Sequence, residues 1–251
     1  MCVIVYKPDG AEISTDILFD CWMQNPDGAG FMYSDGTNIS VLKGFMSWKK
    51  FHDAFLLLKP YQEEMVMAFH FRIKTHGPVS EDLTHPFWIS KNEIAMMHNG
   101  IINVAGIGPQ DSDSSTYAKL LSNVSQYLFH DGMINMIEKS TAGSRLLFMN
   151  KVGNVKITQE DNWVSHLGCQ FSNRSFMYSD IFKSSNGDLR KSVIDEFYLG
   201  KICLNCSEEY NDYELYRDGF LMGGQCPSCG CTGYISEQEE DDEFTDAWRM
   251  L

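Results

Sequence analysis

Residues 25–42 read NPDGAGFMYSDGTNISVL, and this stretch indicates how the chain folds. Asn-Pro-Asp-Gly at 25–28 is a strong turn signal that leads into the apolar run Gly30–Tyr33. A second turn signal, Ser34–Asn38, separates that run from another one, Ile39–Leu42. The stretch therefore predicts two strands joined by a tight turn, which is the connection of an antiparallel pair.

Short strands and tight turns continue on both sides of that stretch. Further strands are expected over residues 2–6, Met65–Ile73, Glu93–Met97, Arg145–Met149 and Val155–Thr158. Helical spacing of apolar residues predicts helices over Trp48–Leu58, after a cap at Ser112 or Asp113, and roughly over Val124–Lys139 with a break at Asp131–Gly132. The pattern favours an α+β fold with antiparallel sheets and helices packed outside them, rather than alternating βαβ units.

Composition and charge narrow the class of protein. The 251 residues are enough for one large core plus a small appendage, and a hydrophobic content of 43% is that of a globular chain. The net charge of −14 argues against general binding to a phosphate backbone. No apolar run approaches the roughly 18–20 residues that span a bilayer, and the start MCVIVYKPDG lacks the basic region of a signal peptide. We therefore expect a cytoplasmic protein with no membrane or nucleic-acid partner, whose cysteines stay reduced.

The last part of the chain has a different character. Cysteines cluster there, aliphatic periodicity fades, and acidic residues crowd Glu237–Asp246. We predict a main domain over residues 1–195, a small module over 196–236 and an acidic tail over 237–251. The tail is either a solubilising segment or an arm that docks on a basic partner.

Four cysteines of the small module have the spacing of a metal site. Two Cys-x-x-Cys pairs are separated by nineteen residues, a zinc-ribbon signature formed by Cys203, Cys206, Cys226 and Cys229. Four thiolates complete a closed tetrahedral site, so the predicted zinc, one per chain, is structural. An iron site of rubredoxin type and two disulfides remain alternatives, and Cys231 is a spare thiol or a substitute ligand. Cys21 and Cys169 stand alone and are expected in the core.

Cys2 is a candidate nucleophile because it directly follows the initiator methionine. Removal of Met1 would leave a thiol and a free α-amine on one residue. The amine, with an unperturbed pKa of roughly 7.7–8.0, can accept the thiol proton without help from a histidine. A cysteine at position two is usually incidental, so this signal needs support from elsewhere in the chain.

Three segments supply that support. Arg72, at the end of a strand and before Thr75-His76-Gly77, can clamp a small carboxylate. Asn99 and Gly100 can stabilise a tetrahedral oxyanion through a side-chain amide and a backbone N–H. A carboxylate in the segment 111–115, DSDSS, can hold an ammonium group. Taken singly, each has a structural alternative: a surface arginine, a hairpin turn and a helix cap.

Together, these segments resemble the class II glutamine amidotransferase domain, of the N-terminal-nucleophile hydrolase type. The resemblance covers roughly residues 2–180. It rests on Cys2, HFRIKTHG at 70–77 followed by Glu81 and His85-Pro86, HNG at 98–100 and SDS at 112–114, in that order; NPDGAGF at 25–31 is similar to the glycine-rich stretch of such domains. The family fold is a four-layer αββα sandwich of two antiparallel sheets between helices.

The resemblance also implies roles for these residues. Cys2 attacks the side-chain carbonyl of glutamine, and a γ-glutamyl thioester forms and is hydrolysed. Arg72 binds the α-carboxylate in a pocket that Thr75 and His76 line. Asn99 and Gly100 form the oxyanion hole, and Asp113 binds the α-ammonium group.

Two departures from the family matter. Ile73 and Lys74 occupy positions often filled by an aromatic residue and an alanine in aminosugar-forming relatives, which leaves the details of the glutamine loop open. The large acceptor domain that usually follows the glutaminase is missing, so an ammonia acceptor would be a separate protein. The leading hypothesis is a glutaminase that feeds ammonia to a partner chain. One alternative is a related hydrolase that cleaves another amide, such as a γ-glutamyl compound. The other is a non-catalytic module that docks through the zinc ribbon and acidic tail, and whose pocket senses glutamine or is idle.

Overall fold

The computed structural model describes residues 2–74, 79–141, 143–177, 216–217 and 220–221. The chain divides into two units, Met1–Met46 with Lys50–Tyr178 and Ser47–Lys49 with Ser179–Leu251. In the second unit, strands β11 (Tyr216–Arg217) and β12 (Phe220–Leu221) pair antiparallel. The predicted domain boundaries near residues 195 and 236 fall outside the described residues and stay predictions.

The first sheet of the first unit has six strands in the order β3-β2-β4-β1-β10-β9, and neighbouring strands run antiparallel. The strands are β1 (Val3–Lys7), β2 (Ala29–Ser34), β3 (Ile39–Phe45), β4 (Val66–Phe71), β9 (Val164–His166) and β10 (Cys169–Phe171). The predicted strand–turn–strand over residues 30–42 is thus confirmed as the β2–β3 hairpin. Asp35 Oδ1 closes its turn by accepting hydrogen bonds from the backbone N–H groups of Thr37 and Asn38, both at 2.8 Å.

The second sheet has four antiparallel strands in the order β5-β6-β7-β8. They are β5 (Phe87–Ser90), β6 (Ile94–Asn99), β7 (Arg145–Asn150) and β8 (Val155–Ile157). The hairpin predicted between residues 145 and 158 is confirmed as β7–β8.

Four α-helices lie among the described residues: α1 (Thr15–Gln24), α2 (Trp48–Leu58), α3 (Asp113–Leu121) and α4 (Asp131–Ser140). Short 3-10 helices are η1 (Lys59–Glu64), η2 (Glu81–Leu83), η3 (Ser122–Tyr127), η4 (Glu160–Asn162) and η5 (Ser175–Met177). The single helix expected over 124–139 is wrong in extent. Val124 has non-helical backbone angles, and α4 begins only at Asp131, where a break had been considered.

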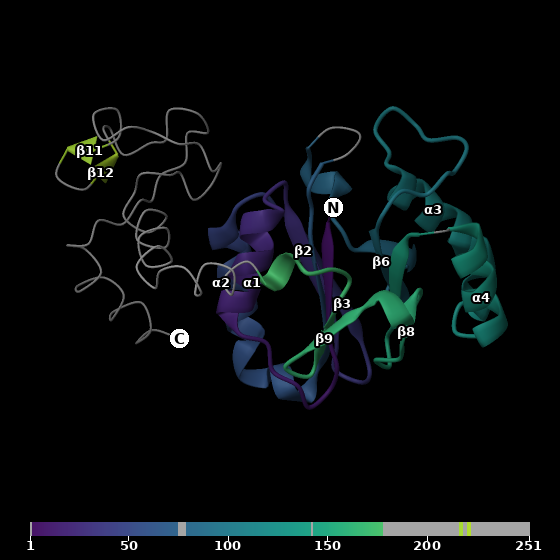
Figure 1. Cartoon of the computed structure of the whole chain (residues 1–251), viewed down its shortest axis with the longest axis horizontal. Helices are drawn as coiled ribbons and strands as arrows, with labels where there is room; N and C mark the ends of the chain where they lie inside the picture. The colour runs from purple at the N-terminus through teal and green to yellow at the C-terminus, as the bar shows by residue number, and fades with distance from the viewer. Residues whose placement is uncertain (1, 75–78, 142, 178–215, 218–219, 222–251) are drawn as a thin grey trace. The chain divides into compact units, whose positions relative to one another are not determined.

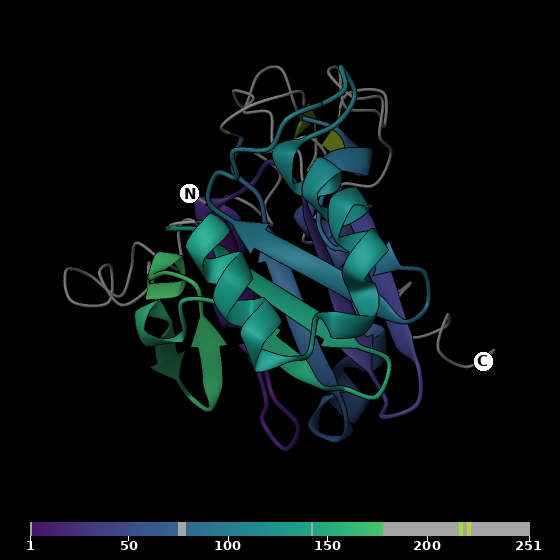
Figure 2. The same ribbon diagram turned by 90° about the vertical axis from the view of Figure 1, so that its right-hand side faces the viewer.

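The two sheets lie face to face, with helices on both outer sides (Figure 1). Ile4, Met32 and Ala68 of the first sheet pack against Ala95, Met97 and Leu147 of the second. The outer face of the second sheet packs against α3 and α4, which cover it in Figure 2; this cluster includes Met96, Phe148, Ala118, Leu121, Ile134 and Ile137. The α+β class with antiparallel sheets and outer helices is therefore confirmed for the described residues.

The outer face of the first sheet carries a cluster of phenylalanines beneath α2. Phe31 and Phe69 from the sheet contact Phe51 of the helix, at ring-centroid distances of 5.7 and 6.3 Å. Phe55 meets Phe69 edge-on at 5.5 Å. Such offset and edge contacts between buried rings are favourable beyond the area they remove from water. Cys21 and Cys169 are 0% and 2% exposed, so their predicted place in the core is confirmed.

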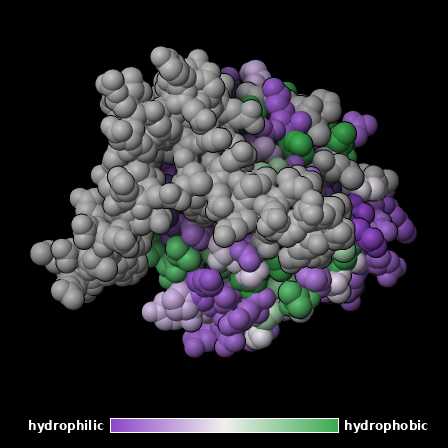
Figure 3. All heavy atoms as spheres, turned by 60° about the vertical axis from the view of Figure 1, so that its left-hand side comes forward, coloured by the Kyte–Doolittle hydropathy of each residue, from purple (hydrophilic) through white to green (hydrophobic). Residues whose placement is uncertain are grey.

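Hydrophilic and hydrophobic residues lie side by side on the described surface seen in Figure 3. None of the helices in the described part of the chain has the length and apolar character needed to cross a bilayer.

Candidate active site

Four of the predicted residues line one cavity of about 410 Å³ in the first unit: Cys2, Arg72, Gly100 and Asp113. The antiparallel register of β1 and β4 pairs Val3 with Phe71, so Cys2 and Arg72 extend the two strands side by side. Gly100 follows β6, and Asp113 begins α3. The cavity thus gathers residues from four segments that are far apart in the sequence.

Cys2 is half-buried at the cavity wall, and its sulfur contacts the backbone of Ile73. The Ile73 N–H donates to Sγ at 3.5 Å, and Sγ also lies 3.5 Å from the Ile73 carbonyl oxygen. Burial raises the pKa of the Cys2 thiol; the Ile73 hydrogen bond and the positive charges of the chain's N-terminus and Arg72 offset the rise only in part. With Met1 in place, the thiol is therefore protonated at neutral pH and needs a base to become a nucleophile.

Arg72 is only 6% exposed, and the predicted turn at 25–28 fixes its backbone. Its N–H donates to the Gly28 carbonyl at 2.8 Å, and its own carbonyl accepts from the Asp27 N–H at 2.9 Å. Gly28 has φ +116°, and a Cβ there would lie 2.8 Å from Thr84 Cγ2, so glycine is required. The turn therefore sets where the guanidinium enters the cavity.

Asp113 is held by backbone amides rather than acting as the helix cap. Its Oδ2 accepts from the Ile102 N–H and its Oδ1 from the Ser114 N–H, both at 2.8 Å. The cap is Ser112, which forms a reciprocal capping box with Ser115. The carboxylate of Asp113 is thus fixed in the cavity wall as a ready acceptor for a cation.

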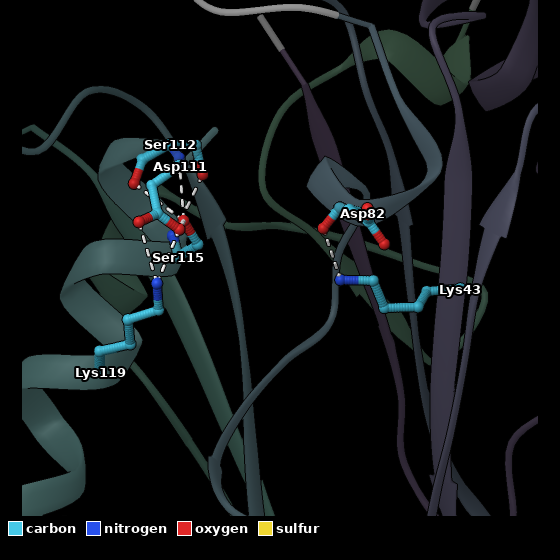
Figure 4. Close-up of polar contacts among 6 residues, drawn as sticks. All are labelled: Lys43, Asp82, Asp111, Ser112, Ser115 and Lys119. Carbon is cyan, nitrogen blue, oxygen red and sulfur yellow. Dashed lines mark hydrogen bonds and ion pairs between the residues drawn. The ribbon is translucent and has the colours of Figure 1, made fainter. Parts of the chain in front are cut away.

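A network around Asp111 supports this helix end (Figure 4). Lys119 Nζ donates to Asp111 Oδ1 and Oδ2 at 2.7 and 2.9 Å, and Ser115 Oγ donates to Asp111 Oδ1 at 3.2 Å. In the same view Lys43 Nζ donates to the Asp82 carbonyl oxygen at 2.9 Å. Asp111 is thereby paired with a lysine of α3, whereas Asp113 has no lysine beside it among the described contacts.

Asn99 and Gly100 lie at the end of β6, at the edge of the cavity. Asn99 is 1% exposed, and its side chain contacts Ser172 Oγ at 2.9 Å instead of lining the cavity. Gly100 lines it, with φ +144°, and a Cβ at this position would lie 2.5 Å from Ser144 Oγ. The glycine is needed both for its backbone angle and for the close approach of Ser144.

Three buried histidines stand beside the cavity: His70, His85 and His98. The rings of His70 and His85 stack at a centroid distance of 4.0 Å. Burial lowers the pKa of His70 to about 3 and that of His98 to about 4, and it also lowers the pKa of His85. All three are neutral and weakly basic at pH 7, so they are poor candidates for the base that a cysteine nucleophile needs.

The remaining predicted site residues lie outside the described part of the chain. These are Thr75 and His76, and the four cysteines 203, 206, 226 and 229. Among the described residues no group of three or more His, Cys, Asp or Glu side chains is arranged to hold a metal ion. The zinc site therefore stays a prediction.

A larger cavity of about 600 Å³ lies between α4, β8 and η4. It contains none of the predicted residues, and its lysine, Lys156, is paired with Asp131 at 2.7 Å. Size therefore does not identify the site here, whereas the chemistry of the lining residues does.

No protein-family model matches the sequence, and comparison with curated proteins finds no match. Among solved structures, the chain is similar to glutamine phosphoribosylpyrophosphate (PRPP) amidotransferase from B. subtilis, complexed with ADP and GMP. The likeness has 14% sequence identity and a TM-score of 0.45, and it covers 70% of this chain and 43% of that chain. The chain thus spans less than half of that protein, and the likeness is distant.

Proposed function

We propose that this chain is a glutamine amidotransferase of class II that hydrolyses the side-chain amide of glutamine through Cys2. The observation that carries the proposal is the single cavity lined by a thiol, a guanidinium, a carboxylate and a backbone glycine from Cys2, Arg72, Asp113 and Gly100. Opposite charges from Arg72 and Asp113 suit the two ends of a free α-amino acid. The thiol beside them suits attack on the side chain of that amino acid.

The proposed reaction starts once Met1 has been removed. The α-amine of Cys2 takes the thiol proton, and the thiolate attacks the side-chain carbonyl carbon of glutamine. The oxyanion that forms receives hydrogen bonds from the Gly100 N–H and the Asn99 amide. The α-ammonium returns the proton to the leaving nitrogen, ammonia departs, and a γ-glutamyl thioester remains. Water then attacks the thioester and releases glutamate and the thiol.

The lowered pKa values of the neighbouring histidines support this assignment of the base. His85 and His98 line the cavity, yet burial keeps their pKa values too low for efficient proton abstraction at neutral pH. An α-amine with an unperturbed pKa of roughly 7.7–8.0 is much better matched to the task.

In this proposal Arg72 binds the α-carboxylate, with Thr75 and His76 in the same pocket, and Asp113 binds the α-ammonium group. We propose that the ammonia acceptor is a separate protein. We also propose that the cysteine-rich module holds a structural zinc.

Glutamate release tests the proposed reaction. The protein whose N-terminal residue is shown by mass spectrometry to be Cys2 should convert glutamine to glutamate and ammonia, and Cys2→Ala should abolish the conversion. Cys21→Ala is a matched control, because Cys21 is a buried residue of α1 and does not line the cavity. Absence of turnover by the processed protein, with and without co-purifying partners, would sink the proposal, as would full activity of Cys2→Ala.

One observation favours a second candidate, a non-catalytic module that binds glutamine. With Met1 retained, Cys2 has no free amine, and burial raises the pKa of its thiol. The cavity can then bind an amino acid without reacting. A retained Met1 in the protein purified from its natural source, together with glutamine binding and no turnover, would establish this alternative.

The proposed zinc is tested by metal analysis. We expect about one zinc per chain, since four thiolates complete one tetrahedral site. Cys206→Ser should lose the metal, whereas Cys169→Ser, which changes a buried cysteine of the main domain, should keep it. Iron in place of zinc, or disulfides between these cysteines, would contradict the prediction.

A further inference from the structure

Ser172, which follows β10, is fully buried and connects the strand of Cys2 to Asn99. Its Oγ accepts a hydrogen bond from the Ile4 N–H at 2.8 Å, and its own N–H donates to the Ile4 carbonyl at 2.9 Å. The same Oγ lies 2.9 Å from the side-chain amide of Asn99. One hydroxyl thus contacts both β1, which begins just after Cys2, and the residue predicted to stabilise the oxyanion.

The donor and acceptor roles in the contact between Ser172 and Asn99 bear on the orientation of the Asn99 side-chain amide. When Nδ2 of Asn99 points at Ser172, the Ser172 Oγ accepts two hydrogen bonds, and the hydroxyl proton of Ser172 has no acceptor among the described residues. Asn99 Oδ1 is then buried without a partner among the described residues. Rotating the amide by 180° lets the hydroxyl donate to Oδ1 and retain its bond from Ile4. Beside Ser172, the rotated amide pairs both the hydroxyl proton and Oδ1, which are polar groups that cost about 1–3 kcal/mol when buried without a partner.

The rotated amide points the N–H groups of Asn99 into the buried position that Oδ1 otherwise occupies. A fixed N–H donor close to the reacting carbonyl stabilises the oxyanion that forms there. Ser172 would therefore determine whether Asn99 presents donors or an acceptor to the reacting centre.

The next residue extends this arrangement to the nucleophile itself. Asn173 Nδ2 donates to the Cys2 carbonyl oxygen at 2.6 Å. Two consecutive residues therefore contact the backbone of Cys2, the backbone of Ile4 and the side chain of Asn99. A shift of this segment would move the nucleophile and the oxyanion donor relative to each other.

We propose that Ser172 is a positioning residue for glutamine hydrolysis, whose hydroxyl holds the Asn99 carboxamide with its N–H groups toward the oxyanion. The inference rests on the proposed function for its catalytic consequence, but the contact between Ser172 and Asn99 is independent of it.

The test compares Ser172→Ala with the wild type in two reactions of Cys2. Glutamine hydrolysis forms an oxyanion, so Ser172→Ala should lower kcat at least about tenfold and leave KM within about twofold. Alkylation of Cys2 by iodoacetamide forms no oxyanion, so its rate should change less than about twofold. Ser165→Ala, at an exposed position of the neighbouring strand β9, is the matched control and should leave both rates unchanged.

The outcomes separate this inference from the proposed function. An unchanged kcat, or equal losses in hydrolysis and alkylation, would overturn the positioning role while the glutaminase proposal stands. If the wild type fails to hydrolyse glutamine, the proposed function fails. The side-chain amide NMR signals of Asn99, assigned by their loss in Asn99→Asp, then decide the inference. They should shift in Ser172→Ala and stay in place in Ser165→Ala; unshifted signals in Ser172→Ala overturn it.

Discussion

Near its C-terminal end, strand β4 (Val66–Phe71) buries different kinds of side chain on its two faces. On one face, Phe69 and Phe71 pack beneath α2, with Phe71 5.0 Å from the ring of Phe51. On the other face, His70 donates from Nε2 to the His98 carbonyl oxygen of β6 at 3.0 Å. Arg72 then follows at the end of the strand and lines the cavity. Alternation along one strand thus places an apolar layer directly behind polar residues of the candidate site.

The difference indicates what each face contributes. The apolar contacts beneath α2 stabilise the fold and exclude polar groups, but they supply no group that could take part in a reaction. On the opposite face, the buried imidazole of His70 and the buried Arg72 are costly for stability, and they lie where a ligand is expected. Changes on the first face should therefore reduce stability and spare activity, and changes on the second should mainly do the reverse.

The largest expected effect belongs to the apolar face. Phe55→Ala removes a fully buried ring that meets Phe69, and it should lower the free energy of unfolding by about 3–5 kcal/mol. Chemical denaturation measures this, and kcat per folded molecule should not change. Leu57→Ala, at a position of the same helix that is 69% exposed, is the control and should cost less than about 0.5 kcal/mol. A loss of kcat in folded Phe55→Ala would break the proposed division between the faces.

Arg72→Lys tests the polar face, and its expected effect is smaller than that of Phe55→Ala. Lysine keeps the charge but cannot bind a carboxylate bidentately, so kcat/KM for glutamine should fall roughly 100-fold, about 2.7 kcal/mol, mainly through KM. Steady-state kinetics measure the split. Arg174→Lys, at an exposed position after β10, should leave both constants unchanged. A fall in kcat with KM intact would mean that Arg72 acts on the reaction and not on carboxylate binding.

The buried histidines predict a dependence of stability on pH. Since burial lowers the folded-state pKa of His70 to about 3 and of His98 to about 4, the unfolded chain binds more protons below pH about 6.5. Stability should be fully present above that pH and should fall between about pH 6.5 and 4, by about 1.4 kcal/mol per pH unit for each such histidine. Denaturation at pH 7 and pH 5 measures the slope.

Replacing one of these histidines should reduce that slope. His70→Gln removes one proton-linked group and should flatten the dependence by up to about 1.4 kcal/mol per pH unit. The exposed His130, just before α4, serves for comparison as His130→Gln. An unchanged slope in His70→Gln would show that the imidazole is not held neutral by burial.

The sequence predicted the parts of the fold that depend on local signals. The turns at 25–28 and 34–38 define β2 and β3, and Ser112 was one of two candidates for the cap of α3. Strand β10, three residues long, carries no such signal and exists because it pairs with β1. Helix α1 was not foreseen, although Ser14 caps it by accepting a hydrogen bond from the Ile17 N–H.

In the candidate site, too, the residues marked by a local motif were predicted, and those that depend on distant contacts were not. Cys2, Arg72, Gly100 and Asp113 were proposed from motifs, and they share one cavity. Ser172 and Asn173 were missed because their significance lies in contacts with Ile4 and Cys2, 168 and 171 positions away, which no local pattern records. The family resemblance included His85 but assigned it no role. The structure places His85 in the lining of the cavity.

Trapping of the covalent intermediate tests the central claim most directly. The processed protein, mixed with glutamine, quenched in acid and digested, should carry one γ-glutamyl group on the sulfur of its N-terminal Cys2. Cys21 and Cys169, both buried, serve as internal controls and should remain unmodified. Absence of the adduct during active turnover, or an adduct on another residue, would contradict the account.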